Sequence, residues 1–303
     1  MDSSTVDVAV WNTKDDGGRS GEHRDFTLDI LAELGDGGPD VLLQQEAKYS
    51  RDRGHDLKHT TEKRLKLRGF LSAPNPSADA DIATAVYLRP DLFHVVRERP
   101  RRKPWWLHPC HVTAQLGDCP VPLNFLSFHM CWFDAGQRLT EAGWLTTQAQ
   151  LGMATIAAGD TNSYPRRPEP VTLPDWDKVT DRAHMVHRTY VDADGHRRSD
   201  TRPDGALIDA GYVDLARFAA DHLGQPGALA ATAGFDKPHQ GGPQRIDRTY
   251  SAGGVAAALE HVEVIDNEDT RAVTDHGLTF YRFHRGRLER ALTQMGKAMP
   301  LPL

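Results

Sequence analysis

Hydrophobic residues recur at every second position near the start of the sequence. Residues 6, 8 and 10 are all valine, and this period of two predicts a β-strand that ends at Asn12. Pro39 opens a second apolar run, Asp-Val-Leu-Leu-Gln-Gln, which predicts a strand with Glu46 at its far end. In both cases a polar residue stands where the predicted strand ends.

Strand-like and helical runs then follow without strict alternation. Strand-like runs lie at 82–88, 122–128, 153–158 and 278–283, and helical patterns lie at 26–34, 137–150, 213–222 and, at the C-terminus, about 286–298. Because many strands are short and joined by Pro/Gly turns, the order predicts an α/β sandwich with mixed sheets rather than a doubly wound parallel sheet. The Pro-, Asp- and Arg-rich segment 160–205 is predicted to form long surface loops.

Polar residues with the chemistry of an active site recur at or near the ends of these runs. They are Asn12, Glu46, His129, Asp160 with Asn162, Asp247, and Asp275 with His276. A single Asp or Asn at a strand end is most often only a turn residue. Strand ends on one edge of a sheet can converge, however, so six such segments predict a shared site.

The same residues carry a resemblance to a known family. The motifs are Val-Trp-Asn12, Leu-Gln-Gln-Glu46, Ser-Phe-His129, Gly-Asp160-Thr-Asn162-Ser, Arg-Ile-Asp247 and Thr-Asp275-His276. In this order they resemble the motifs of the endonuclease/exonuclease/phosphatase superfamily, which includes pancreatic-type deoxyribonuclease and abasic-site endonucleases. The resemblance runs from about residue 6 to residue 283. Thr161, Thr274 and Gly277-Leu278 depart from the usual motifs but leave the functional atoms in place.

The resemblance implies a fold and an arrangement of domains. The expected fold is a four-layer α/β sandwich, in which two mixed β-sheets are flanked by helices and the active site lies at one edge. One catalytic domain is expected to span residues 1–303.

A divalent cation is expected in this site. Phosphodiesters resist attack because their oxygens are negative and their leaving group is poor, and a bound cation relieves both problems. Mg²⁺ prefers carboxylate and carbonyl oxygens, which Asn12, Glu46 and Asp275 can supply, and Mn²⁺ can substitute on the same ligands.

The resemblance also implies roles for the remaining motif residues. Asp160 and Asn162 would align the attacking water, and their side chains would lean to the same side if the segment is extended. His276 would contact the scissile phosphate, with Asp247 holding its ring in one tautomer. His129 would be the second histidine of the site, with Asp79 or Asp81 as its partner acid. Taken alone, His129 is as well explained as a packed residue at the end of a strand.

The formal net charge of −6 argues against an electrostatic grip on nucleic acid by the whole molecule, so an anionic substrate needs a local basic patch or a metal. The basic residues that precede a tryptophan pair predict a surface that grips the backbone and stacks on bases. This stretch consists of Arg97, Arg99, Arg101, Arg102, Lys103, Trp105 and Trp106. Further basic groups lie at 48–68 and at Arg197, Arg198 and Arg202. For the segment at 48–68 a solvated helix face is the favoured reading.

These observations predict a metal-dependent phosphodiester hydrolase, a DNA endonuclease or exonuclease. The alternatives are a phosphatase or phosphodiesterase that acts on a small or lipid substrate, and a non-catalytic binding protein with the same fold. Apolar runs are too short for a membrane span. The three cysteines lack C-x-x-C spacing and suit a reducing compartment, so a cytoplasmic protein is expected.

Overall fold

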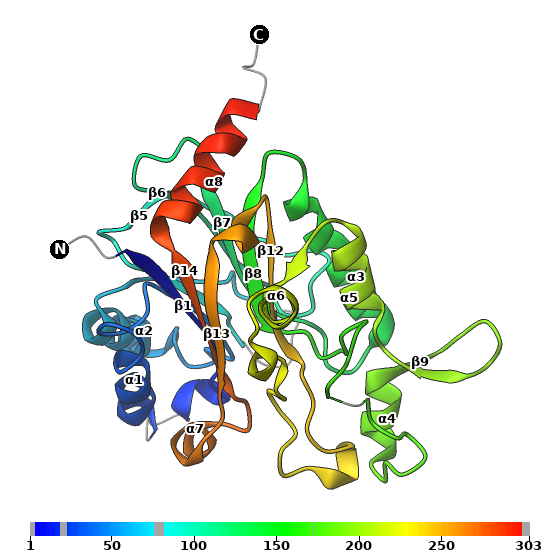
Figure 1. Cartoon of the computed structure of the whole chain (residues 1–303). Coiled ribbons are helices and arrows are strands. Elements are labelled where there is room, and N and C mark those ends of the chain that lie inside the picture. The colour runs from blue at the N-terminus through cyan, green and yellow to red at the C-terminus, as the bar shows by residue number, and fades with distance from the viewer. Residues whose placement is uncertain (1–3, 19–22, 76–81, 172, 299–303) are drawn as a thin grey trace.

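Two six-stranded β-sheets form the centre of the protein in a computed structural model that describes residues 4–18, 23–75, 82–171 and 173–298 (Figure 1). The first sheet has the order β13-β14-β1-β2-β4-β3, with β1 (Thr5–Asn12), β2 (Val41–Gln45), β3 (Arg68–Leu71), β4 (Ala85–Leu88), β13 (Leu259–Ile265) and β14 (Leu278–His284). The second has the order β11-β12-β8-β7-β6-β5, with β5 (Phe93–Glu98), β6 (Cys110–Leu116), β7 (Leu123–His129), β8 (Ala154–Asp160), β11 (Val213–Asp214) and β12 (Asp247–Ala252). Both sheets are mixed, because β1 runs parallel to β2 and β7 parallel to β8 while the other pairs are antiparallel.

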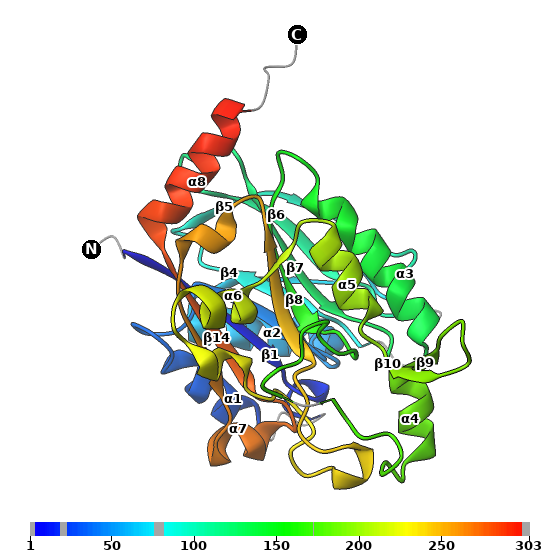
Figure 2. The ribbon, with the colours of Figure 1, turned by 45° about the vertical axis from the view of Figure 1, so that its right-hand side comes forward.

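The helices are α1 (Arg24–Ala32), α2 (Asp52–Leu65), α3 (Ala135–Leu145), α4 (Arg182–Arg188), α5 (Arg202–Asp209), α6 (Leu215–His222), α7 (Glu268–Val273) and α8 (Arg285–Ala298). Residues of α1, α2 and α7 pack on the outer face of the first sheet, and residues of α3 and α5 pack on that of the second. Residues of α6 and α8 contribute to the core between the sheets, whereas α4 has no buried residue. Figure 2 shows α3 and α5 side by side against the second sheet. The predicted four-layer α/β sandwich is confirmed.

The alternation in β1 explains how the layers form. Val6, Val8 and Val10 point into the core between the two sheets, where they meet residues of β7 and β8. Ala9 and Trp11 point the other way and pack with residues of α1, α2 and α7. Successive side chains of a strand face opposite sides of the sheet, so one strand contributes to two cores.

A third core lies on the far face of the second sheet. There, Phe128 and Ala157 of the central strands pack against Ala142 and Leu145 of α3 and Leu207 of α5. Each sheet is thus buried on both faces along its middle, and its strand ends remain available for a site.

Several strand ends lie at the same edge. Asn12 pairs with Gln45 in the parallel β1–β2 ladder, and His129 pairs with Asp160 in the parallel β7–β8 ladder. The two sheets are joined near this edge, because the side-chain amide of Gln45 donates to the hydroxyl of Ser127 over 2.9 Å. Strand order therefore brings the motif residues of both sheets together.

Two of the segments assigned from the sequence pattern have a different secondary structure from the one predicted. Segment 160–205 contains α4 and a hairpin of β9 (Thr189–Val191) and β10 (Arg197–Ser199), in addition to loops. The run at 213–222 begins as strand β11, and Asp214 then caps α6 by accepting the backbone N–H groups of Ala216 and Arg217. A side-chain oxygen at the N-cap favours this late helix start.

The terminal helix expected at about 286–298 is present as α8. Within the described part of the chain, every helix falls short of the length and apolar character that a membrane crossing needs.

Candidate active site

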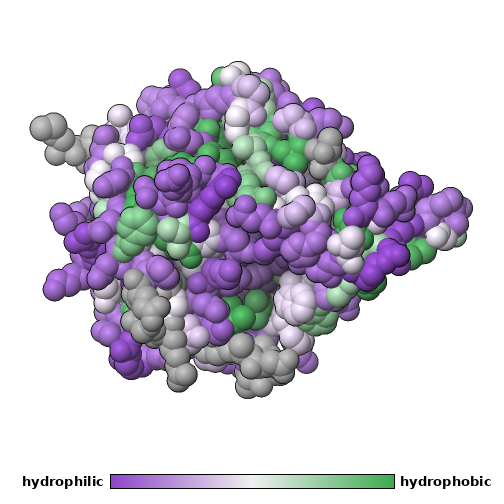
Figure 3. Space-filling view, turned by 90° about the horizontal axis from the view of Figure 1, so that it is seen from below, coloured by the Kyte–Doolittle hydropathy of each residue, from purple (hydrophilic) through white to green (hydrophobic). Residues whose placement is uncertain are grey.

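A cleft of about 560 Å³ lies at the edge where the strand ends meet. Six of the eight predicted catalytic and metal-binding residues line it: Glu46, His129, Asp160, Asn162, Asp275 and His276. Asn12 and Asp247 lie directly behind them and are almost fully buried. The face seen from below in Figure 3 is mostly hydrophilic, with small hydrophobic patches.

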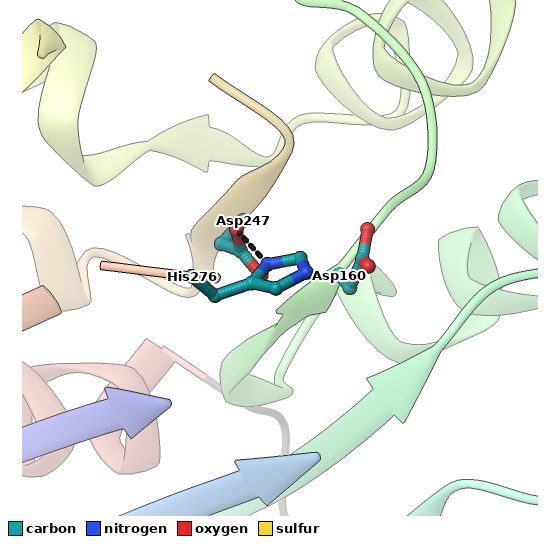
Figure 4. A group of neighbouring side chains, drawn as sticks. All are labelled: Asp160, Asp247 and His276. Carbon is teal, nitrogen blue, oxygen red and sulfur yellow. Dashed lines mark hydrogen bonds and ion pairs between the residues drawn. The ribbon is translucent and has the colours of Figure 1, made fainter. Parts of the chain in front are cut away.

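His276 is held between two carboxylates (Figure 4). Its Nδ1 lies 2.9 Å from Oδ2 of Asp247, and its ring faces Asp160 on the other side. The backbone N–H of Asp247 donates to the hydroxyl of Thr232 over 2.9 Å, which fixes the start of β12. Asp247 faces Asp160 across the antiparallel β12–β8 pair, so both carboxylates reach the same edge.

The charges of neighbouring side chains determine the protonation of His276 and Asp160. Burial lowers the pKa of His276, but the nearby carboxylates, Asp247 first, outweigh burial and raise it to about 9. Burial also works against ionisation of Asp160, yet His129 and His276 bring the pKa of that carboxyl below its usual value. These shifts favour a protonated His276 beside an ionised Asp160 at neutral pH, and burial raises the pKa of Asp247, so that Asp247 and His276 hold their proton as a pair.

Asp160 and Asn162 are joined by a tight turn. The backbone N–H of Asn162 donates to Oδ1 of Asp160 over 2.8 Å, and the side-chain amide of Asn162 donates to the carbonyl of Met130 over 2.9 Å. Asn162 has a φ of 49°, so the segment is left-handed here and not extended. Both residues still line the cleft, because the turn and not strand alternation brings them to the same side.

His129 lies near one acid from each sheet, Glu46 after β2 and Asp160 at the end of β8. Its Nε2 is 3.5 Å from Oδ2 of Asp160, and its Nδ1 is 3.9 Å from Oε1 of Glu46. The predicted partner acids, Asp79 and Asp81, lie outside the described residues. Among the described residues, Glu46 and Asp160 are the acids that His129 faces.

Glu46 follows β2 directly and is positioned by the loop after β1. Its Oε1 accepts the side-chain amide of Asn12 over 3.2 Å, and its Oε2 accepts the backbone N–H of Asp15 over 3.2 Å. Glu46 itself has a φ of 58°, which turns the chain sharply at the strand end. Asn12 thus supports Glu46 from behind.

Asp275 lies beside two lysines. Lys237 donates to its Oδ2, and the ammonium of Lys14 is 3.6 Å from its Oδ1. Burial opposes ionisation, but Lys237 and the other nearby cations bring the pKa of Asp275 down to about 2. Asp275 is therefore a carboxylate at every physiological pH.

The donor set fits a divalent cation. Glu46, Asn12 and Asp275 offer carboxylate and amide oxygens of the kind that Mg²⁺ prefers. The carboxylate of Asp275 already binds two cationic groups in this cleft, the ammonium groups of Lys14 and Lys237. A cation bound here would share Asp275 with these two lysines, whereas the position of Glu46 is fixed by hydrogen bonds from Asn12 and Asp15.

The predicted stacking surface at 97–106 is arranged differently from the expectation. Trp105 is only 5% exposed and packs against Phe128 and Trp144, so its faces cannot stack on a base. Arg99 donates to the hydroxyl of Thr113, and the guanidinium of Arg101 lies 5.2 Å from the centre of the Trp144 ring. Among the described residues, the cleft wall includes Trp106 but none of the cations of this stretch, namely Arg97, Arg99, Arg101, Arg102 and Lys103.

Other residues line the cleft that the sequence pattern did not single out. Three are cationic: Lys14, Arg188 and Lys237. Two are aromatic, Trp132 and Phe133, which follow His129 closely in the chain. Trp132 and Phe133 follow the motif residue His129 closely, and this position in the sequence could have indicated that they line the site. Arg188 and Lys237 lie in segments without any motif.

Solved structures with a similar fold are known. The endonuclease/exonuclease/phosphatase family protein from Bacteroides thetaiotaomicron matches with a TM-score of 0.58 and 15% identity, covering 92% of this chain and 94% of the other. An AP endonuclease from Archaeoglobus fulgidus matches with a TM-score of 0.60 and 13% identity over 92% and 99%. This chain has the endonuclease/exonuclease/phosphatase fold. The resemblance inferred from the motifs is thereby confirmed for the fold.

A third structure of this fold, D. rerio TDP2 complexed with a single strand DNA product, has a TM-score of 0.60 and 17% identity, covering 93% of this chain and 99% of the other. By sequence alone, neither a protein-family model nor a curated protein matches the chain. At such low identity, similarity of structure shows a shared fold, and function must be argued from the site.

Proposed function

We propose that this protein is a divalent-metal-dependent phosphodiester hydrolase that cleaves DNA, with residues 1–303 forming one catalytic domain. The observation that carries the proposal is the placement of His276 between Asp247 and Asp160 in a cleft that also presents Glu46 and Asp275. Separate strands from both sheets supply these groups, and such convergence has no role in holding the core together. The single strand DNA product in the D. rerio TDP2 structure supports DNA as the substrate.

Each side chain has a distinct task in the proposed reaction. Asp160 is ionised and accepts the proton of the attacking water, which the Asp160–Asn162 turn aligns. His276 presents positive charge to the scissile phosphate, because Asp247 keeps its ring protonated and oriented. His129, beside Asp160, protonates or clamps the leaving oxygen.

A metal would be held by Glu46 and Asp275, with Asn12 directly behind Glu46. Bound Mg²⁺, or Mn²⁺ in its place, supplies Lewis-acid stabilisation of charge on the phosphate. The Asp160–Asp247–His276 cluster also brings three ligand-type atoms within 4.8 Å of one another. We assign that cluster to proton transfer, because Asp247 already engages Nδ1 of His276.

The three cysteines are free and buried, which suits a reducing compartment, and we infer a cytoplasmic enzyme. A non-catalytic binding protein with this fold would have no need for ionised Asp160 beside protonated His276.

Replacement of Asp160 tests the proposal. Supercoiled, linear single-stranded and duplex DNA are incubated with the protein in Mg²⁺ or in chelator. We expect cleavage only with Mg²⁺, and a loss of about 100- to 10,000-fold in kcat for Asp160→Asn, the range that a general base contributes.

The matched control is Asp118→Asn, an exposed carboxyl in the turn between β6 and β7, far from the cleft along both strands. It should cleave as the unmodified protein does. Full activity of a folded Asp160→Asn protein, or equal cleavage in chelator, would contradict the proposal.

A further inference from the structure

Aromatic side chains form a continuous wall on one side of the cleft. The wall consists of Trp106, Trp132 and Phe133, with His187 at its end. Neighbouring ring centres are 4.8 Å apart for Trp106 and Phe133, 5.2 Å for Phe133 and Trp132, and 5.1 Å for Trp132 and His187. Each pair meets edge to face, so the rings brace one another.

Trp132 is exposed although packing alone would bury it, and Trp106 and Phe133 are half-buried. Trp132 is 50% exposed, whereas Trp105, next to Trp106 in the chain, is only 5% exposed and belongs to the core. Burial of a large aromatic side chain is strongly favourable. A tryptophan left half in solvent beside a row of ionisable groups is therefore better explained by a ligand than by packing.

Two buried side chains of α3 hold the backbone of this wall. Glu141 accepts the N–H of Trp106 over 2.7 Å with one oxygen and the N–H of Cys131 over 2.8 Å with the other. Both Glu141 and Arg138 are fully buried.

Arg138 reaches the same wall from the neighbouring turn of α3. It donates to the carbonyl of Cys131 over 2.9 Å and to that of His187 over 2.6 Å. Burying a charged group is costly unless it is paired and hydrogen-bonded, and Arg138 forms its ion pair with the buried Asp200. The hydrogen bonds of Arg138 and Glu141 fix the loops that carry the rings. The wall is thus rigidly positioned before any ligand arrives.

Cations lie in the same cleft as the wall. Lys14 and Lys237 contact Asp275, and Arg188 lines the cleft with an Nη1 that is buried without a hydrogen-bond partner among the described residues. An aromatic surface next to positive charge suits a ligand that is flat at one end and anionic at the other. A nucleotide unit has this chemistry.

We propose that Trp106, Trp132 and Phe133 stack on unpaired nucleobases of a single-stranded nucleic acid whose phosphate lies in the cleft. Bases in a duplex are stacked on one another, so only an unpaired base offers its face to an aromatic side chain. The inference rests on the proposed function, and it adds a preference for single strands or unpaired ends. Of the stretch at 97–106 that the sequence predicted as a base-stacking surface, only Trp106 belongs to this wall.

Binding measurements test this wall without any need for turnover. An Asp160→Asn protein is titrated with a fluorescent oligothymidylate and with a blunt-ended duplex of two separate strands and equal phosphate number, each in Mg²⁺. Oligothymidylate should bind at least about 10-fold more tightly than the duplex and should quench tryptophan fluorescence. Adding Trp132→Leu, which keeps an apolar side chain without an aromatic face, should weaken single-strand binding by about 5- to 150-fold and leave duplex binding nearly unchanged.

The control is Phe26→Leu, which removes another partly exposed aromatic ring, 38% exposed on α1 and outside the cleft lining. It should bind the oligonucleotide as the parent does. Unchanged single-strand binding by a folded Trp132→Leu protein, or an equal loss for the duplex, would overturn the proposal. So would Trp132-dependent binding to anionic phospholipid vesicles that exceeds binding to the oligonucleotide. Loss of Mg²⁺-dependent cleavage in Asp160→Asn would still support the proposed function in each of these cases.

Discussion

At the scale of single residues, the charge state of His276 depends on its surroundings. A buried histidine with no acidic neighbour would tend to stay neutral at pH 7. Asp247 lies 2.9 Å away and Asp160 lies on the opposite side of the ring, so the protonated form is favoured. The folded protein thereby holds the positive charge of His276 beside the expected position of a phosphodiester.

Protonation of His276 in the folded state predicts that the stability of the protein depends on pH. The pKa of His276 is raised in the folded state to about 9 from an ordinary value near 6.5. A raised pKa stabilises the folded state fully below about pH 6.5, and the contribution is lost as the pH rises through about 9. We expect the free energy of unfolding, measured by urea titration in chelator, to fall by up to about 3 kcal/mol more across this window than in His276→Asn.

A histidine elsewhere serves as the control. His261 is exposed on β13, and His261→Asn should keep the pH dependence of the unmodified protein. If His276→Asn has the same slope between pH 6.5 and 9 as the unmodified protein, Asp247 does not hold a proton on His276.

At the scale of elements, the parallel pair β7–β8 places two site residues in register. His129 and Asp160 are paired at the ends of these strands. Gly159, just before Asp160, lies so close to β7 that an added Cβ would be 1.7 Å from the carbonyl oxygen of Phe128. The missing side chain lets the two strands approach where the site is built.

Substitution at this glycine is expected to be costly. Gly159→Ala should lower the free energy of unfolding by roughly 1–3 kcal/mol or more, because backbone and not a flexible side chain would have to move. Activity should fall as well, since His129 and Asp160 would separate. The control Gly143→Ala, at an exposed position in α3 with open space around it, should instead stabilise the protein by about 0.5–1 kcal/mol. Equal urea midpoints for the two variants would refute this account of β7–β8.

At the scale of the whole molecule, the protein is acidic, and its cleft contains cations beside the carboxylates of Glu46, Asp160 and Asp275. The net charge is −6, yet Lys14, Arg188 and Lys237 line the cleft. Long-range attraction of nucleic acid is therefore weak, and binding depends on local contacts.

Salt dependence measures how many cations contact the substrate. Each neutralised phosphate of a single strand contributes a slope of about −0.7 to log K against log salt, so three cations predict about −2. Lys237→Met should reduce the slope by about 0.7, and Lys63→Met, at an exposed position of α2, should leave it unchanged. A slope steeper than about −4 would show that basic groups outside the cleft, such as the stretch at 97–103, also contact the strand.

The amino-acid sequence by itself determined the alternating strand β1, the α/β layers and the polar residues at the edge. These features follow from local periodicity and from the residue types placed at the ends of apolar runs. The order of the motifs added the expectation of a sandwich, and the structure confirms it. Strands such as β5 and β13 were not predicted, because edge strands carry a mixed pattern that fits neither period well.

Only the tertiary structure decided which partners meet. Trp105 and Trp106 are adjacent and chemically identical, yet one packs in the core and the other lines the cleft. Lys237 lies 38 residues from Asp275 in the chain, and no local pattern could pair them. Burial, pairing and pKa depend on distances between segments remote in sequence, and these distances are fixed by the packing of two sheets against each other.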